Sequence, residues 1–153
     1  MSAELRPGVF TRLFAEIQAA QEVKTRKVLT ALALAAERQA KINASVGSHK
    51  RGTPTPARPG TGPAVISGTL RRSLTHTTPI KTGTGWSVKV GTGVGFNPPY
   101  GRTPASKYGL ILEKTGTRAG TTFPFLVPAA EFTMRVVAPQ LYRAAFRSGW
   151  PRI

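Results

Sequence analysis

Apolar positions in the first third of the chain recur at the spacing of an α-helix. Residues 8 to 46 contain no proline and are rich in Ala, Leu, Lys, Arg, Gln and Glu, which favour helices. We therefore predict one helix over 8–46, with Pro7 in its first turn and Gly47 at its end. The apolar positions form two stripes, one of Phe10, Leu13, Phe14, Ile17 and Ala20 and one of Val28, Leu32, Ala35 and Ile42. A helix about 57 Å long must project or break. A projecting part could contact a neighbouring subunit, and a core helix with frayed ends is the alternative.

Residues 48–63, SHKRGTPTPARPGTGP, contain four prolines and three glycines and cannot form a regular element. We predict a mobile basic loop that becomes ordered only against a partner. Its Lys50, Arg51 and Arg58 are the candidates for contact with a polyanion. A plain flexible linker is the alternative.

The pattern then changes to short segments. Ser67 can cap a short helix that places Leu70 and Leu74 on one face. From Thr75 to Val90, apolar and polar residues alternate on both sides of a Gly83-Thr84-Gly85 turn. This pattern predicts a hairpin whose half-buried face carries Trp86, Val88 and Val90. Residues 91–107 predict a loop, and 129–147 predict a helix that is kinked or broken at Pro139. The order predicts one α+β domain over 1–153, with a long N-terminal helix and a C-terminal helix packed on a small, mostly antiparallel sheet within 64–147.

The stretch from Tyr108 to Glu131 predicts a connector, a strand or turn that holds the C-terminal helix. Gly116 and Gly120 permit turns, while Pro124 and Pro128 favour an extended path. Five residues are expected in its core: Tyr108, Leu112, Phe123, Phe125 and Leu126. Glu113 is expected to bind an arginine or backbone donors, since an unpaired buried carboxylate is costly, and a solvated Glu113 is the alternative.

Charge narrows the choice of partners. The 22 Lys and Arg residues face six acids, all glutamate, which gives a net charge of +16 and a pI near 11.6. This predicts a polyanionic partner, with nucleic acid preferred, although a solvated basic surface would also account for it. No 18-residue apolar run or cleavable leader occurs, so we expect neither membrane insertion nor secretion.

The chemistry-bearing residues point away from catalysis. The chain has no Cys or Asp and only two histidines, His49 and His76, so we predict no catalytic constellation, no metal site and no cofactor. The glycine-rich run Gly91 to Gly95 lacks the Lys-Ser/Thr of a phosphate-binding loop. We therefore expect a protein that is not an enzyme.

Two sequence blocks resemble one known family. YGLILEKTGT (108–117) followed by FPFLVPAAE (123–131) is similar to a motif of siphophage neck and tail-completion proteins, and SGTLRRSL (67–74) is similar to their "Gly-any-Leu-Arg-any-Ser-apolar" turn of helix. The resemblance covers about residues 63–147. Lys114 and the segment from Arg118 to Thr122 depart from the pattern, which has an aromatic and a histidine there. The matching positions are Leu70, Arg71, Ser73, Tyr108, Leu112, Glu113, Gly116, Thr117, Pro124, Phe125, Leu126 and Pro128.

The resemblance implies a structural protein of the virion neck, assembled in the host cytoplasm. Such a protein would form a ring, expected to be a hexamer, and join the head connector to the tail tube around the DNA. Its partners would be copies of itself, the neighbouring connector and tail-tube proteins, and duplex DNA bound without sequence preference. The sequence does not distinguish a tail terminator from an adjacent neck ring, or six copies from twelve. It also leaves open whether the basic loop faces DNA or an acidic neighbour. The alternative class is a basic nucleic-acid-binding module.

Overall fold

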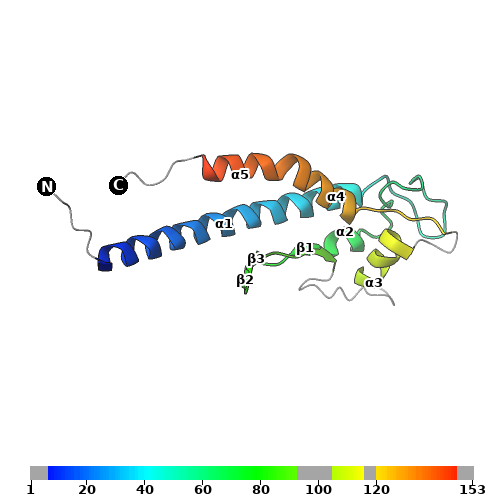
Figure 1. Ribbon diagram of the computed structural model, residues 1–153. Helices are drawn as coiled ribbons and strands as arrows, with labels where there is room; N and C mark the ends of the chain where they lie inside the picture. Colours follow the sequence, from blue (N-terminus) through cyan, green and yellow to red (C-terminus); the bar gives the residue numbers. More distant parts are fainter. Residues whose placement is uncertain (1–6, 93–104, 116–119, 148–153) are drawn as a thin grey trace.

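The long helix α1 (Pro7–Asn43) is the axis of the fold. The computed structural model describes residues 7–92, 105–115 and 120–147. In Figure 1, α1 lies between the C-terminal helices and a narrow β-ribbon, so the fold is α+β as predicted. The shorter elements are α2 (Thr69–Ser73), β1 (Leu74–His76), β2 (Ile80–Thr82), β3 (Gly85–Ser87), β4 (Val90–Thr92), α3 (Ala105–Leu110), the π-helix η1 (Ile111–Thr115), α4 (Leu126–Phe132), the π-helix η2 (Thr133–Val137) and α5 (Ala138–Phe146).

Helix α1 is longer than a compact domain of this chain length is wide. Its 37 residues span about 55 Å at 1.5 Å per residue. A compact globule of 153 residues has a diameter of roughly 38 Å. The helix is unbroken, so its N-terminal part extends past the body (Figure 1). It ends at Asn43, three residues before the predicted end, and Gly47 follows with a positive φ of 74°.

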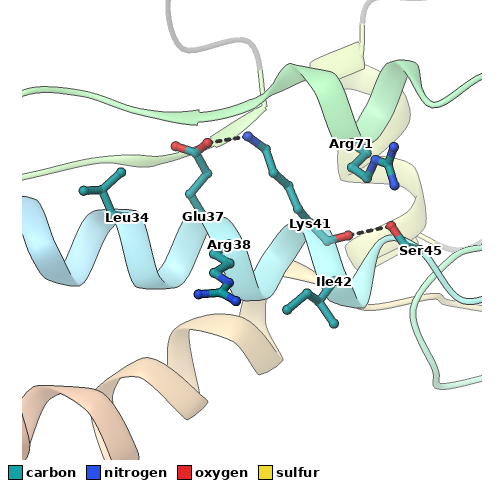
Figure 2. A pocket seen from close by; sticks show the side chains of 7 residues that line it. All are labelled: Leu34, Glu37, Arg38, Lys41, Ile42, Ser45 and Arg71. Carbon is teal, nitrogen blue, oxygen red and sulfur yellow. Dashed lines mark hydrogen bonds and ion pairs between the residues drawn. The ribbon is translucent and has the colours of Figure 1, made fainter.

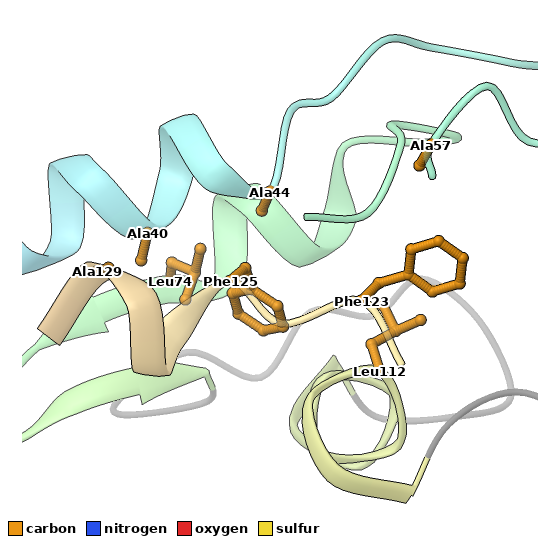
Figure 3. Packing of buried hydrophobic residues seen from close by; sticks show 8 residues of the cluster. All are labelled: Ala40, Ala44, Ala57, Leu74, Leu112, Phe123, Phe125 and Ala129. Atoms are coloured by element: carbon orange, nitrogen blue, oxygen red, sulfur yellow. The ribbon is translucent and has the colours of Figure 1, made fainter. Parts of the chain in front are cut away.

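From residue 15 to its end, the fully buried positions of α1 are the alanines Ala33 and Ala40, and Ala44 just after the helix is also buried. Ala40 and Ala44 belong to one core cluster with Ala129 of α4, Leu74 and Phe125 (Figure 3). Small side chains at these positions allow the backbones of α1 and α4 to approach closely. Ile42, which its spacing assigns to a packed stripe, is instead 55% exposed.

The β-strands form one long antiparallel ribbon in two paired sections, which confirms the predicted hairpin. Strand β1 pairs with β4 and β2 pairs with β3, and the Thr82–Gly85 pair closes the turn. As predicted, Trp86, Val88 and Val90 are half-buried, while Ser87 and Lys89 between them are exposed. The guanidinium of Arg26 lies 5.6 Å from the centre of the Trp86 ring and holds the ribbon against α1.

Three predicted local structures are wrong. Gly68, in the left-handed conformation, occupies the N-cap position of α2 that was predicted for Ser67, although the Ser67 hydroxyl accepts a hydrogen bond from the N–H of Thr69 at 3.4 Å. Leu74 begins β1 rather than continuing the helix. Residues 105–115, expected as loop and connector, form α3 and η1. The short helix is stabilised by tertiary packing, since Gly109 approaches Leu70 and Thr92 closely and Leu112 is buried. Gly91 and Thr92, also predicted as loop, belong to β4. Residues 93–104 of the predicted loop lie outside the described residues.

The C-terminal helix begins at Leu126, three residues before the predicted start, because Pro128 fits in its first turn. The kink or short break expected at Pro139 takes the form of the π-helical segment η2, which ends just before it. The N–H of Ala138 donates to the carbonyl of Thr133, five residues back, and this wider turn precedes a proline that cannot donate.

Candidate functional site

The carboxylate of Glu113 caps the N-terminus of α4. Its Oε2 accepts hydrogen bonds from the N–H groups of Phe125 and Leu126 at 2.8 and 3.0 Å, and its Oε1 accepts one from Val127 at 2.7 Å. Phe125 occupies the N-cap position, where its side chain cannot accept a hydrogen bond. Glu113, 12 to 14 residues earlier in the chain, therefore satisfies the donors that an N-cap Ser or Asp would normally satisfy. Of the two predicted kinds of partner, the backbone donors are confirmed.

The core beside this cap contains most of the expected residues. Leu112, Phe123 and Phe125 are buried, and Leu126 is partly buried against the cluster (Figure 3). The N–H of Phe123 donates to the carbonyl of Leu112 at 2.8 Å. Tyr108 is 41% exposed, so its assignment to the core was wrong: it lies on the outward side of α3, one residue before the buried Gly109.

The two sequence blocks of the motif, about 35 residues apart, lie side by side. Helices α2 and α3 pack together, and a Cβ at Gly109 would lie 3.3 Å from Leu70. Ser73 is fully buried, and its hydroxyl donates to the carbonyl of Leu70 at 2.7 Å. Pro124 and Pro128 flank the capped start of α4, whereas Gly116 and Thr117 lie outside the described residues.

The basic loop 48–63 is held to the body of the protein, which corrects the prediction of a mobile loop. Ala57 is buried in the core cluster, and the N–H of Gly60 donates to the carbonyl of Thr122 at 3.0 Å. A Cβ at Gly62 would lie 1.6 Å from the carbonyl oxygen of Asn43, so only glycine fits against the end of α1. The proline and glycine content of the loop predicts that it has no helix or strand, but it does not predict whether the loop packs against the rest of the protein.

Lys50, Arg51 and Arg58 are all exposed on this loop, at positions where they are accessible to a partner. The other cations are not gathered around them. Exposed Lys and Arg residues occur also on α1, α2, the β-ribbon and α5, for example Arg38, Arg72, Lys89 and Arg143. The described surface is therefore basic over most of the molecule rather than at one focused patch.

A groove of about 750 Å³ runs beside α1 (Figure 2). We call it the α1 groove. Leu34 and Ile42 give it apolar walls, and Arg38, Lys41 and Arg71 give it positive charge, with Ser45 and Glu37 completing the lining. Sequence analysis missed this groove. Its signal was the spacing of Leu34, Arg38 and Ile42 four residues apart on one face of α1.

Glu37 belongs to a charged cluster that joins α1 to the β-ribbon. It pairs with Lys41 on the same helix, and its Oε2 lies 2.5 Å from Nδ1 of His76 on β1. Burial on its own raises the pKa of Glu37. The hydrogen bonds and charges of Lys41 and His76 outweigh that burial, so the pKa is lowered from its ordinary value of 4.5. The negative charge in the α1 groove is thus already engaged within the chain.

Large apolar side chains are more common on the surface than in the core. Among the described residues, four buried apolar side chains besides Pro63 are larger than alanine, and thirteen large hydrophobic residues are exposed. Five of the exposed ones belong to the C-terminal helical run: Val127, Phe132, Met134, Val136 and Tyr142. We call them, with the exposed Glu131 among them, the C-terminal ridge. Exposed apolar surface on this scale is typical of protein interfaces.

Within the described ranges, no group of His, Cys, Asp and Glu side chains is arranged to hold a metal ion. None of the helices in this part of the chain has both the length and the apolar character needed to cross a membrane. Comparison of the chain with protein-family models, curated protein sequences and solved structures finds no match.

Proposed function

We propose that the protein is a structural component of a tailed bacteriophage virion, a ring-forming tail-completion or neck protein that joins the head connector to the tail tube. The observation that carries the proposal is the excess of exposed large apolar side chains over buried ones in a chain built on a projecting helix. A chain that leaves this surface uncovered is suited to association with copies of itself.

The geometry of the motif supports the resemblance to neck proteins. Its glutamate caps the helix that its Phe-Leu segment begins, and its upstream block packs on the helix that carries Tyr108. The residues of the two blocks thus pack together around the α3–η1 segment and the start of α4. This gives a physical reason for them to occur together.

The charge of the chain supports a place beside DNA. Six copies at +16 each would bring on the order of a hundred positive charges around one axis. Such a ring attracts phosphates without reading bases, and it loses affinity steeply as salt is raised. Exposed cations on most elements of the described surface fit contact with a backbone rather than recognition of one sequence.

Mass spectrometry of purified phage particles tests the proposal, together with deletion of the gene. We expect the protein in the particles, and we expect unjoined heads and tails after deletion. Absence of the protein from the particles, or normal particles after deletion, would refute the proposal.

Solution measurements separate the proposed function from a basic nucleic-acid-binding module. Light scattering should give a multimeric mass, and duplex DNA should bind weakly and without sequence preference. Replacing Lys50, Arg51 and Arg58 with Gln should reduce the slope of log affinity against log salt by up to about 3, if all three contact phosphates. A strict monomer with submicromolar affinity for DNA would favour the module.

A further inference from the structure

We infer that the α1 groove of one copy receives the C-terminal ridge of a second copy, with Arg38 of the groove paired to Glu131 of the ridge. The inference rests on the proposed function and names the contact between neighbouring subunits. It is carried by the shape, charge and exposed area of two surfaces that lie on different sides of the same chain.

The C-terminal ridge points away from α1. Ala129 and Thr133, which flank Glu131 by two positions on either side, are buried. Two positions correspond to about 200° of rotation in a helix, so Glu131 is turned away from the buried side. The α1 groove is lined by α1, Ser45 and Arg71 of α2 (Figure 2). One chain therefore cannot place its own ridge in its own groove.

The two surfaces have complementary charge. Three of the five glutamates in the described part of the chain have partners within it: Glu22 pairs with Lys81, Glu37 with Lys41 and His76, and Glu113 with backbone N–H groups. Among the described residues, Glu16 and Glu131 form no ion pair. In a chain with 22 cations, an available carboxylate in the middle of an apolar ridge is suited to fix the orientation of a basic partner surface.

Arg38 is the cation of the groove best placed to receive this carboxylate. It lies four residues from both Leu34 and Ile42, so apolar side chains border it along the helix. Lys41 is already bound to Glu37, whereas Arg38 forms no ion pair with any described residue. A guanidinium can also bind both oxygens of a carboxylate, which sets the orientation of the contact.

Both surfaces expose apolar area that a neighbouring copy could cover. The five apolar residues of the C-terminal ridge are 43–64% exposed and together present on the order of 500 Å². Leu34 and Ile42 add roughly 200 Å² on the groove side. A standard interface buries about 800 Å² on each partner, so these apolar residues supply only part of the contact area and the surrounding polar and charged side chains must supply the rest.

A contact between two different surfaces of identical chains can repeat head-to-tail from one copy to the next. Such contacts generate rings when the rotation closes and open filaments when it does not. The inferred contact therefore provides what a neck ring requires. A two-fold dimer would make the same contact twice, once in each direction, and would close with two copies instead of a ring.

A charge exchange tests the pairing of Arg38 and Glu131. Sedimentation velocity of the full chain should show that Glu131→Arg and Arg38→Glu each weaken association at least tenfold, and that the double variant recovers to within threefold of the wild type. Glu16→Arg and Lys89→Glu are controls with matched charge changes at exposed positions outside the contact. Circular dichroism confirms that each variant is folded.

Cross-linking gives an independent measurement, because the chain has no cysteine. Mild oxidation of a mixture of Leu34→Cys and Met134→Cys should give dimers containing one of each. The chain that carries both substitutions should give a ladder of larger species. Dimers that form only within each single variant would overturn the inference.

The outcomes separate the inference from the proposed function. If the wild type associates but Glu131→Arg and Arg38→Glu behave like their controls, the inferred contact is wrong and a ring built through other surfaces stands. If Arg38→Glu weakens DNA binding alone, the groove binds phosphate and the inference is also wrong. If the charge exchange restores association but the protein is absent from phage particles, the contact is right and the proposed function is wrong.

Discussion

Removal of the Glu113 carboxylate should destabilise the protein, because the N–H groups at the start of α4 lose their hydrogen-bond acceptor. The three N–H groups that donate hydrogen bonds to this carboxylate belong to the N-cap and the first two positions of α4. Phe125 is 1% exposed, so water cannot readily replace the carboxylate at its N–H. Val127 is 50% exposed, and water can replace the carboxylate there. The cost of the change is therefore concentrated at the buried donor.

The expected loss for Glu113→Ala is about 2–4 kcal/mol. An unsatisfied buried donor costs about 1–3 kcal/mol. Loss of a cap and of negative charge at a helix N-terminus adds about 1 kcal/mol. Glu113→Gln keeps one accepting oxygen but loses the charge and the second acceptor, so its expected loss is about half of that.

Urea unfolding followed by circular dichroism measures the difference. The free energy of unfolding should fall in the order wild type, Glu113→Gln, Glu113→Ala, with unchanged dependence on urea concentration. Glu16→Ala, a change to an exposed glutamate on α1, is the control and should stay within about 0.5 kcal/mol of the wild type. Two protein concentrations are needed because association adds to the apparent stability. Equal losses in Glu113→Ala and the control would refute the reasoning.

Three further predictions follow from other contacts. Gly62→Ala places a methyl group against the Asn43 carbonyl and should cost about 3 kcal/mol or more, while Gly83→Ala, in open space, should cost less than about 1 kcal/mol; similar unfolding midpoints would contradict this. The lowered pKa of Glu37 means that its stabilisation is present above its ordinary value of 4.5 and is lost as pH falls through the lowered value. Glu37→Gln should therefore make stability less dependent on pH in that acid range, and an unchanged slope would count against the cluster. Lys81→Gln breaks an exposed ion pair and should change the free energy of unfolding by less than about 0.5 kcal/mol, so a large loss would show that the pair matters more than its exposure indicates.

The elements that could be predicted from the sequence depend on local chemistry. A proline-free run of helix formers specifies α1 wherever it packs. Alternation around a Gly-Thr turn specifies the β-ribbon, because the side-chain period and the turn agree. Engagement of Glu113 by backbone donors was open to prediction for a similar reason, since a carboxylate among buried residues needs a partner. Its particular donors lie 12 to 14 residues away and depend on the folded path between them.

The parts that could not be predicted depend on tertiary packing. Helix α3 contains Gly109, a poor helix former, and the close approach of that glycine to Leu70 and Thr92 compensates for it. The loop 48–63 has the composition of a mobile segment, yet Ala57 is buried in the core. The apolar spacing along α1 predicts that Ile42 lies on an apolar face of the helix, but it does not predict whether another part of the chain covers that face.

The placement of large and small side chains on α1 has a further consequence. Among the positions of α1 whose side chains are described, the fully buried ones are Ala33 and Ala40, while Leu34 and Ile42 are more than half exposed. Burial of a full leucine or isoleucine side chain contributes about 1.5–3 kcal/mol, and alanine contributes much less. The isolated chain thus gains little from the residues that should stabilise it most. Under the inferred contact, that stabilisation comes from the neighbouring subunit. The unfolding midpoint of the wild type should therefore rise with protein concentration, whereas that of Glu131→Arg should not.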